Sequence, residues 1–492
     1  MKKMFHLANS LKVFGLSASF LLLLLLLAAT IPFFPAGRAM ATEPVMGAYF
    51  PRWVIWERNY QVTNIPAAQL THLFYAFVAP DYRTNRAVLV SDPAADATNF
   101  PALRKLKQKY PHLKTLISVG GASSSQDFSD IMASAVTRTS LVEACASFIV
   151  SNGFDGVDLD WEYPVEGGGT DVTHRASDAT NFVLFLQSLR ARLDAQKVRD
   201  GHDYLITAAT SANADDITNR YRLAQMSPYV DWFNLMTYSY AGMWEPRTAH
   251  IAPLYKNPAS WHPNESVDVT VQAYLRQGVP ASQLVLGVSF YGMGYSQATN
   301  ANHGLFQPYG GAATGTWSDE TFDFKDLAAH YINTNGYVRY FDEVSRAPYL
   351  YSTNTHIFIS YDDERSIYEK TAYAVSNGLG GVMCWAIDAD TRAYALQRAM
   401  YRGTYPLCFE YLHVLDPQAG KFEMAWQGVQ GETFTLNYAS AVSGLWTTCT
   451  GLISTNAKAI TNLVGTDGVL TVVHTLGSAT QGFYRISAPP LP

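Results

Sequence analysis

Apolar runs alternate with amphipathic segments along the first 400 residues of the chain. Segments such as 140–153 and 174–196 are apolar on one helical face only. The runs between them are short and rich in β-branched and aromatic residues, which is typical of buried strands. They span residues 45–50, 70–78, 113–121, 154–162, 204–210, 231–239, 284–292 and 378–387. This repeated alternation predicts an α/β fold, a TIM (β/α)8 barrel over residues 42–405.

Two stretches break the alternation. Residues 293–358, after the seventh run, combine Gly- and Thr-rich loops with one helical piece and several strand-like pieces. We predict a small α+β insertion in the seventh βα loop, on the face where barrels keep their active sites, so that it would wall a cleft. Residues 408–492 are rich in Thr, Val, Gly and Ser. They predict a β-sandwich-like accessory module, whose role could be carbohydrate binding, attachment or spacing.

The first 41 residues have the pattern of a secretory signal peptide. Lys2, Lys3 and Lys12 precede a long apolar run, and a small-x-small motif ends at Ala41. The alternative is an uncleaved membrane anchor, because the apolar run is long. With cleavage near Ala41, we expect a secreted protein, extracellular or periplasmic, with no stable membrane partner.

Composition narrows the class of protein. The 492 residues are 48% hydrophobic and 15% charged, which suits a large core and excludes a disordered chain. A net charge of −6 and the lack of a basic stripe argue against a nucleic-acid partner. Cys145 and Cys384 lie in apolar surroundings and are predicted to be core residues. Cys408 and Cys449 could pair in an oxidising compartment.

The stretch FDGVDLDWEYP, residues 154–164, concentrates carboxylates in a predicted strand. Side chains alternate across a strand, so Asp158, Asp160 and Glu162 share one face and point into the barrel, while apolar residues face outward. Asp155 is out of phase and is predicted to be structural. Like charges about 6.6 Å apart raise at least one pKa, which favours Glu162 at the rim as a general acid. A divalent metal site is the alternative, because metals also require clustered acids.

The octad DGVDLDWE, residues 155–162, resembles the DxxDxDxE signature of the family 18 glycoside hydrolases, the chitinases and their relatives. Further segments resemble this family in the same order over about residues 45–402. They are LTHLFYAF (70–77), SVGG (118–121), NLMTYSYAGMWE (234–245), LVLGVSFYG (284–292), SYDDERSIYEK (360–370) and GLGGVMCWAIDAD (378–390). Residues 293–358 resemble the α+β insertion of the subgroup with deep clefts.

The resemblance implies retaining cleavage of β-1,4 bonds next to N-acetylglucosamine, in chitin or chito-oligosaccharides, with no cofactor and no metal. The acetamido group of the substrate would act as the nucleophile, an exception to the usual pair of catalytic carboxylates. Glu162 would serve as acid and then base. Asp160 would orient the acetamide and stabilise the cation, and Asp158 would share a proton or a hydrogen bond with Asp160. Tyr238 would hydrogen-bond the acetamido carbonyl.

The matched positions also imply substrate-binding residues. Trp385 would form the floor beneath the sugar at the cleavage point, and the others are Tyr49, Phe77, Trp53, Trp244, Glu245, Met236 and Ser239. The sequence departs from the family where Ser239 replaces Asp, and where Ser289 and Met293 replace Pro and Arg. Two alternatives therefore stay open: an endo-N-acetylglucosaminidase acting on other glycans, and a catalytically weak chitin-binding lectin. We expect a monomer.

Overall fold

The computed structural model describes residues 43–405 and a set of strands after them. The predicted signal peptide, residues 1–41, lies outside the described residues, and so do Cys408 and Cys449. Of the described helices, none is long and apolar enough to cross a membrane.

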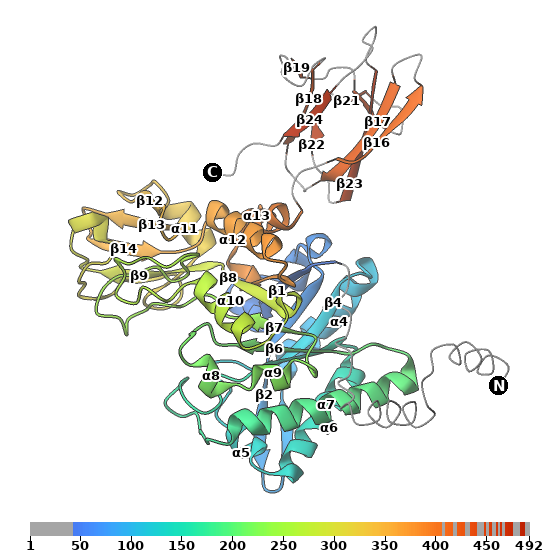
Figure 1. Cartoon of the computed structure of the whole chain (residues 1–492), viewed down its shortest axis with the longest axis vertical. Coiled ribbons are helices and arrows are strands. Elements are labelled where there is room, and N and C mark those ends of the chain that lie inside the picture. Colours follow the sequence, from blue (N-terminus) through green and yellow to red (C-terminus); the bar gives the residue numbers. More distant parts are fainter. Residues whose placement is uncertain are drawn as a thin grey trace, which may run out of the picture. The chain divides into compact units, whose positions relative to one another are not determined.

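In the described part of the chain, eight parallel strands close into a barrel (Figure 1). The ring closes because the first strand pairs with both the second and the last. The strands are β1 Val45–Pro51, β2 His72–Arg83, β4 Lys114–Gly120, β5 Gly156–Asp160, β6 Leu205–Thr210, β7 Trp232–Leu235, β8 Leu284–Ser289 and β15 Gly381–Trp385. Each corresponds to one predicted strand, and the predicted TIM barrel is confirmed. A short strand, β3 Arg86–Val90, pairs antiparallel with the end of β2.

Helices between the strands cover the outside of the barrel, and their ends follow local sequence signals. Helix α4 begins after Asp92, whose carboxylate accepts hydrogen bonds from two backbone amides of the first turn. Helix α6 ends at Gly153, which has a φ of 76°. The longer helices are α4 Pro93–Lys109, α6 Ala135–Asn152, α7 Asp178–Asp200, α10 Val267–Arg276, α12 Glu364–Ser376 and α13 Ala395–Thr404. The shorter ones are α3 Val54–Glu57, α5 Phe128–Met132, α8 Ile217–Arg220 and α9 Leu223–Met226.

The apolar face of β5 packs against this helical layer, as its alternation predicts. Trp161 stacks on Phe128 of α5 at 5.2 Å between ring centroids and meets Phe182 of α7 edge-on at 5.5 Å. Cys145 of α6 and Cys384 of β15 are buried free thiols, so the prediction that they are core residues is confirmed. With one face of β5 occupied by core packing, the acidic residues must point into the barrel.

The chain forms a second, antiparallel sheet in the segment that follows β8 and precedes α12 in the sequence. Its strand order is β10-β9-β14-β13-β12, with β11 paired to β9. The elements are β9 Tyr291–Ser296, β10 Gly311–Ala312, β11 Thr321–Asp323, α11 Phe324–His330, β12 Val338–Asp342, β13 Ala347–Ser352 and β14 Ile357–Ser360. The sheet occupies the part of the chain where the sequence predicted an insertion.

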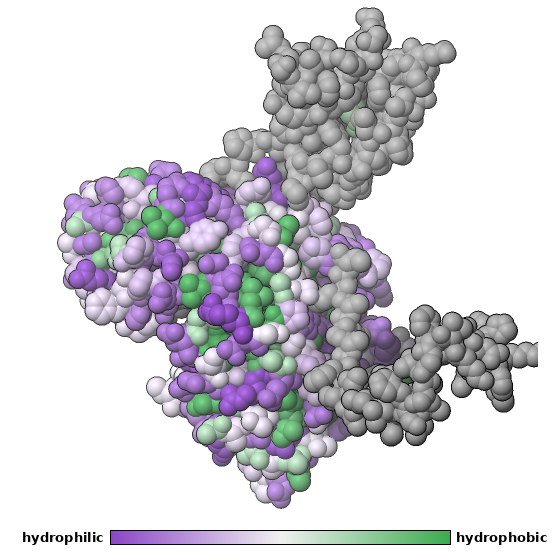
Figure 2. All heavy atoms as spheres, in the orientation of Figure 1, coloured by the Kyte–Doolittle hydropathy of each residue, from purple (hydrophilic) through white to green (hydrophobic). Residues whose placement is uncertain are grey.

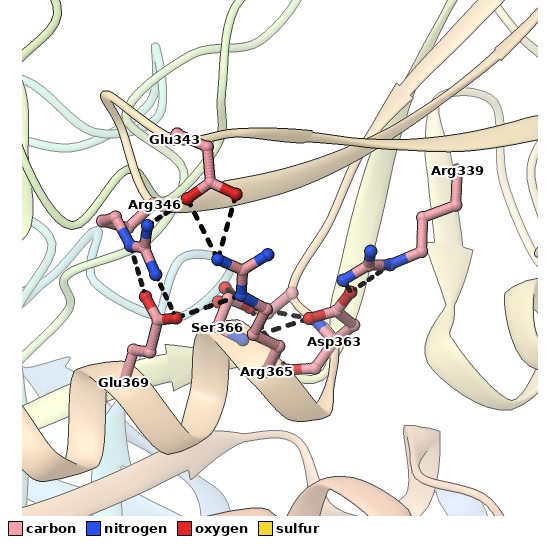
Figure 3. Close-up of polar contacts among 8 residues, drawn as sticks. Arg339, Glu343, Arg346, Asp363, Arg365, Ser366 and Glu369 are labelled. Atoms are coloured by element: carbon pink, nitrogen blue, oxygen red, sulfur yellow. Dashed lines mark hydrogen bonds and ion pairs between the residues drawn. The ribbon is translucent and has the colours of Figure 1, made fainter. Parts of the chain in front are cut away.

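An ion network joins this insertion to the barrel helix α12 (Figure 3). Arg346, in the insertion, pairs with Glu369 of α12 at 2.6 Å and with Glu343. Arg365 of α12 also contacts both carboxylates, at 3.0 Å from Glu343 and 3.1 Å from Glu369. The bidentate contacts fix the orientation of the insertion relative to the helix.

The strands after residue 405 pair antiparallel in two sheets. The first has the order β16-β17-β23-β20-β21, and the second has the order β19-β18-β22 with β24 beside β18. Their bounds are β16 Phe409–Asp416, β17 Lys421–Gly428, β18 Thr433–Ala439, β19 Thr447–Thr448, β20 Leu452–Ser454, β21 Ala459–Ile460, β22 Leu463–Val464, β23 Gly468–Thr475 and β24 Phe483–Ser487.

The surface shown in Figure 2 is mixed. Hydrophilic residues spread over the barrel and the insertion, and hydrophobic residues gather in smaller groups between them. Several tryptophans are nevertheless more than half exposed, among them Trp56, Trp244, Trp261 and Trp317. Of these, Trp244 lies in the lining of the cavity described below.

Candidate active site

The acids of β5 are stacked inside the barrel and rise toward its C-terminal rim. Asp158 and Asp160 are buried, and Glu162 follows the end of the strand. Gly120 of β4 lies opposite Asp160, with a φ of 112°. A Cβ on Gly120 would lie 2.1 Å from the carbonyl oxygen of Asp160. This position therefore needs glycine both for its backbone conformation and for the close approach of β4 and β5.

Asp158 is surrounded by hydrogen-bond donors. Its Oδ2 accepts from the hydroxyls of Tyr49 at 2.8 Å and Ser118 at 2.7 Å. Its Oδ1 accepts from the Thr207 hydroxyl at 2.6 Å and from Asn234 Nδ2 at 3.1 Å. Burial raises the pKa of Asp158, and these four donors oppose the rise. The arrangement stabilises a carboxylate at the bottom of the stack.

Asp160 and Glu162 lie in a different environment. Burial and the charges of Glu162 and Asp158 raise the pKa of Asp160 well above its usual value. Its buried Oδ1 has no hydrogen-bond partner among the described residues. Burial also raises the pKa of Glu162 to about 7, while a hydrogen bond with Tyr163 opposes the rise. Below about pH 7, Glu162 therefore carries a proton that it can donate, which suits general acid catalysis. Asp160 beside it binds its own proton more tightly than an ordinary aspartic acid does.

A cavity of about 980 Å³ opens above these acids. Its aromatic wall is continuous, because Phe77 stacks on Trp385 at 5.6 Å and Trp53 lies 6.5 Å from Phe77. The sequence-predicted residues that line it are Asp160, Glu162, Tyr238, Trp385, Tyr49, Phe77, Trp53, Trp244, Met236 and Ser239. A volume of this size accommodates a ligand of several rings.

Three predicted residues do not present an open surface to the cavity. Asp158 is fully buried at the bottom of the acid stack, on the inward face of the strand, where the sequence predicts it. Tyr49 is only 1% exposed, and its ring packs on Phe74 at 4.7 Å, so it holds Asp158 and cannot act as an open stacking surface. Glu245 faces a small neighbouring pocket, where its carboxylate lies 3.2 Å from His262 Nε2.

Sequence reasoning missed several residues of the cavity, and Arg220 illustrates why. Its guanidinium lies over the ring of Tyr163 at 4.5 Å, and it bonds Ser211 Oγ at 2.9 Å and Asp216 at 2.8 Å. Through Tyr163 it supports the segment that follows Glu162. These residues come from loops and short helices, where neither strand nor helix periodicity marks a buried side.

Each position that departs from the family pattern has a defined partner. Ser239 has a positive φ of 53°, and its hydroxyl lies 2.5 Å from that of Tyr291, which also lines the cavity. The Ser289 hydroxyl donates to Asp362 Oδ2 at 3.0 Å. Met293 is buried in an apolar cluster of the insertion. Tyr291 is the residue of the insertion sheet that reaches the cavity lining.

The donor arrangement also bears on the metal alternative. Among the described residues, no group of three or more His, Cys, Asp or Glu side chains is arranged to hold a metal ion. Both oxygens of Asp158 already accept hydrogen bonds from protein donors. The hydrogen-bonding capacity of Asp158 is thus taken up by protein donors.

Comparison with known proteins agrees with this geometry. Residues 45–390 match the sequence model described as Glycosyl hydrolases family 18. Chitinase A1 of Niallia circulans is 39% identical over 435 residues, which cover 78% of this chain and 62% of that protein. The match thus leaves more than a third of that relative's length uncovered.

Solved structures extend the likeness to the fold. Chitinase ChiA74 from Bacillus thuringiensis aligns with a TM-score of 0.70 and 30% identity over 91% of this chain and 84% of that one. A family 18 N-acetylglucosaminidase from Paenibacillus barengoltzii aligns with a TM-score of 0.65 and 34% identity, covering 73% of this chain and 100% of that one.

Proposed function

Because the chain belongs to family 18 of the glycosyl hydrolases, we propose that it hydrolyses β-1,4 bonds between N-acetylglucosamine units of chitin or chito-oligosaccharides. The observation that carries this proposal is the position of Glu162. Its carboxyl group, with a pKa of about 7, lies beside Asp160 in a large cavity with an aromatic wall. The similarity to Chitinase A1 supports the choice of chitin as the substrate.

In the first step, Glu162 donates its proton to the glycosidic oxygen, and the bond from that oxygen to the anomeric carbon breaks. The acetamido oxygen of the same sugar attacks the anomeric carbon and forms a cyclic oxazolinium ion. Asp160 passes its proton to Asp158, and the Asp160 carboxylate then holds the acetamido N–H and stabilises the positive charge. The hydroxyl of Tyr238, whose pKa is raised by burial, keeps its proton and donates to the acetamido oxygen.

In the second step, Glu162 is ionised and acts as a base. It takes a proton from a water molecule, whose oxygen attacks the anomeric carbon from the side the leaving group occupied. The bond from that carbon to the acetamido oxygen breaks, and the acetamide is restored. Two displacements at one carbon give a product that retains the β configuration.

Aromatic residues would bind the sugar rings on either side of the cleavage point. Trp385, Phe77 and Trp53 form a stepped apolar surface in the cavity, and Trp244 is a separate exposed ring of the lining. Flat rings of this kind supply large contact areas at low cost in conformational entropy. They suit the faces of pyranose rings in a linear polymer.

Secretion is part of the proposal. Residues 1–41 carry the basic, apolar and small-residue regions of a signal peptide. Expression in a secreting bacterial host and N-terminal sequencing of the exported protein would test this. An exported protein that begins at Thr42 supports the proposal. A protein that still begins at Met1 and stays in the membrane fraction contradicts it.

The activity test compares the protein with Glu162→Gln on chitohexaose, with products separated by anomer over time. β-anomeric products from the wild type, reduced at least 100-fold in the variant, support a retaining hydrolase with Glu162 as its acid. Binding without cleavage by the wild type would support the lectin alternative. Ser239→Asp, which restores the usual residue of the family, would then be the next variant.

A second candidate is an N-acetylglucosaminidase that releases single sugars. The structural likeness to the Paenibacillus barengoltzii enzyme favours it. Early products from chitohexaose separate the two candidates. Disaccharides and longer oligomers indicate a chitinase, whereas N-acetylglucosamine as the first product indicates the second candidate.

A further inference from the structure

Trp244 lines the cavity, yet little of the protein holds its side chain. The residue is 62% exposed. Its ring lies on the Cα of Gly242, where a Cβ would come within 2.3 Å of a ring carbon. A hydrogen bond of 3.0 Å from the Glu245 amide to the Gly242 carbonyl closes the turn that carries it. The orientation of the indole therefore follows the orientation of this turn, residues 242–245.

The turn is held from outside by the insertion. The hydroxyl of Tyr309 lies 2.7 Å from the carbonyl oxygen of Glu245 and 3.1 Å from that of Met243. A hydroxyl has one proton, so Tyr309 donates mainly to Glu245 and shares the proton with Met243. These two carbonyls flank Trp244 in the sequence, so one hydroxyl fixes the backbone on both sides of the indole.

Tyr309 is itself firmly anchored. Its ring packs edge-on against the buried Tyr295 of β9 at 4.8 Å. The amide of the next residue, Gly310, donates to the Ser296 carbonyl of β9 at 2.9 Å, and the Thr299 amide donates to the Pro308 carbonyl at 3.1 Å. Tyr309 therefore transmits the position of the antiparallel sheet to the turn.

We propose that Tyr309 is a positioning residue, through which the insertion sets the orientation of Trp244 for substrate binding. The inference rests on the proposed function, because it takes Trp244 as a sugar-binding residue. The insertion contributes Tyr291 to the cavity lining. The proposal adds a second role for the insertion, the positioning of Trp244. Tyr309 itself does not touch the substrate.

The test is Tyr309→Phe, which keeps the ring contact with Tyr295 and removes the hydroxyl. We expect KM for chitohexaose to rise about threefold to tenfold, which corresponds to the loss of one ordinary hydrogen bond. The kcat should change less than twofold, because the acids of β5 are untouched. A purely structural defect would instead lower the amount of active enzyme and with it the apparent kcat.

A double-mutant cycle identifies the route of the effect. If Tyr309 acts through Trp244, then Tyr309→Phe adds no further rise in KM to Trp244→Ala. Tyr295→Phe is the matched control, because the Tyr295 hydroxyl is buried in the same cluster without a hydrogen-bond partner among the described residues. It should leave KM unchanged. An unchanged KM in Tyr309→Phe, or an equal rise in the Trp244→Ala background, overturns the proposal.

Hydrogen exchange gives a readout that needs no substrate. In Tyr309→Phe, amides of residues 242–248 should exchange faster, whereas those of the core strand β5 should not change. Failure of the wild type to cleave or bind chitohexaose would reject the proposed function without affecting this measurement. Unchanged exchange in the turn would reject the role of Tyr309.

Discussion

At the scale of single residues, Asp158 depends on donors from four different strands. Tyr49 comes from β1, Ser118 from β4, Thr207 from β6 and Asn234 from β7. None of these neighbours is close to Asp158 in the sequence. The barrel brings them together because inward-facing side chains of its strands meet at the same level.

Tyr49→Phe removes one of these donors and keeps the ring stacked on Phe74. We expect kcat to fall about tenfold to a hundredfold with little change in KM, because a hydrogen bond to a charged group contributes about 1.5–3 kcal/mol. Tyr75→Phe is the control, since it removes a similar buried bond of 2.7 Å to Asp96, away from the cavity. Steady-state kinetics on chitohexaose check both variants, and equal effects on kcat would contradict the assignment.

The raised pKa of Glu162 predicts a pH-dependent stability. The group is ordinarily protonated below 4.5, and in the folded protein below about 7. As pH rises from 4.5 to 7, the unfolded chain loses this proton first, so the folded state loses stability relative to it. Glu162→Gln removes this cost and should raise Tm relative to the wild type more at pH 8 than at pH 4.

Thermal unfolding at the two pH values checks this prediction. Glu166→Gln makes the same chemical change at an exposed position and is the control. A Tm difference between Glu162→Gln and the wild type that is the same at pH 4 and pH 8 would contradict the raised pKa.

At the scale of elements, the contact between β4 and β5 sets the height of Asp160. Gly120→Ala would place a Cβ 2.1 Å from the Asp160 carbonyl oxygen and 2.7 Å from the Phe128 ring, at a φ of 112°. Since backbone atoms cannot turn away, we expect a loss of about 3 kcal/mol in the free energy of unfolding, and loss of activity.

Gly153→Ala is the matched variant. Gly153 also has a positive φ, 76°, but a Cβ there would meet nothing within 4 Å. It should cost about 1 kcal/mol, the strain of a left-handed backbone alone, with normal kcat. Urea denaturation and kinetics measure both variants. Similar losses of unfolding free energy in the two variants would show that the close approach of β4 and β5 is not what requires glycine at position 120.

At the scale of the whole molecule, a buried ion pair marks where the insertion meets the barrel. Lys370 of α12 contacts Asp362 at 2.5 and 2.6 Å, and neither side chain is exposed. Asp362 also accepts from Ser366 at 2.7 Å and from Ser289, at the end of β8, at 3.0 Å. Through Asp362, the end of β8, where the insertion begins, is therefore linked to α12, the helix that follows the insertion.

Lys370→Met leaves the Asp362 charge buried without its partner, and should cost about 3–5 kcal/mol. Adding Asp362→Asn should recover part of this loss, because it removes the uncompensated charge. Arg192→Met, which breaks a surface pair with Glu143, is expected to cost less than about 1 kcal/mol. Chemical denaturation tests the series, and a loss no larger than that of Arg192→Met would contradict the assignment.

The sequence by itself determined the strands of the barrel and the order of the acids on β5. Both follow from periodicity: a strand buried on its outer face must turn every second residue inward, which places Asp158, Asp160 and Glu162 in one stack. The aromatic residues of the cavity came from the resemblance to family 18, whose matched motifs contain them.

Only the tertiary structure decided what surrounds those acids. The burial of Tyr49 follows from packing between neighbouring strands inside the barrel. The position of Glu245 beside His262, the contacts of Arg220 and the reach of Tyr309 to the Trp244 turn depend on loops outside the barrel strands. Loop backbones have no repeating period, so the direction of their side chains is set by distant contacts. For the same physical reason, the pKa of Glu162 follows from burial in the folded molecule.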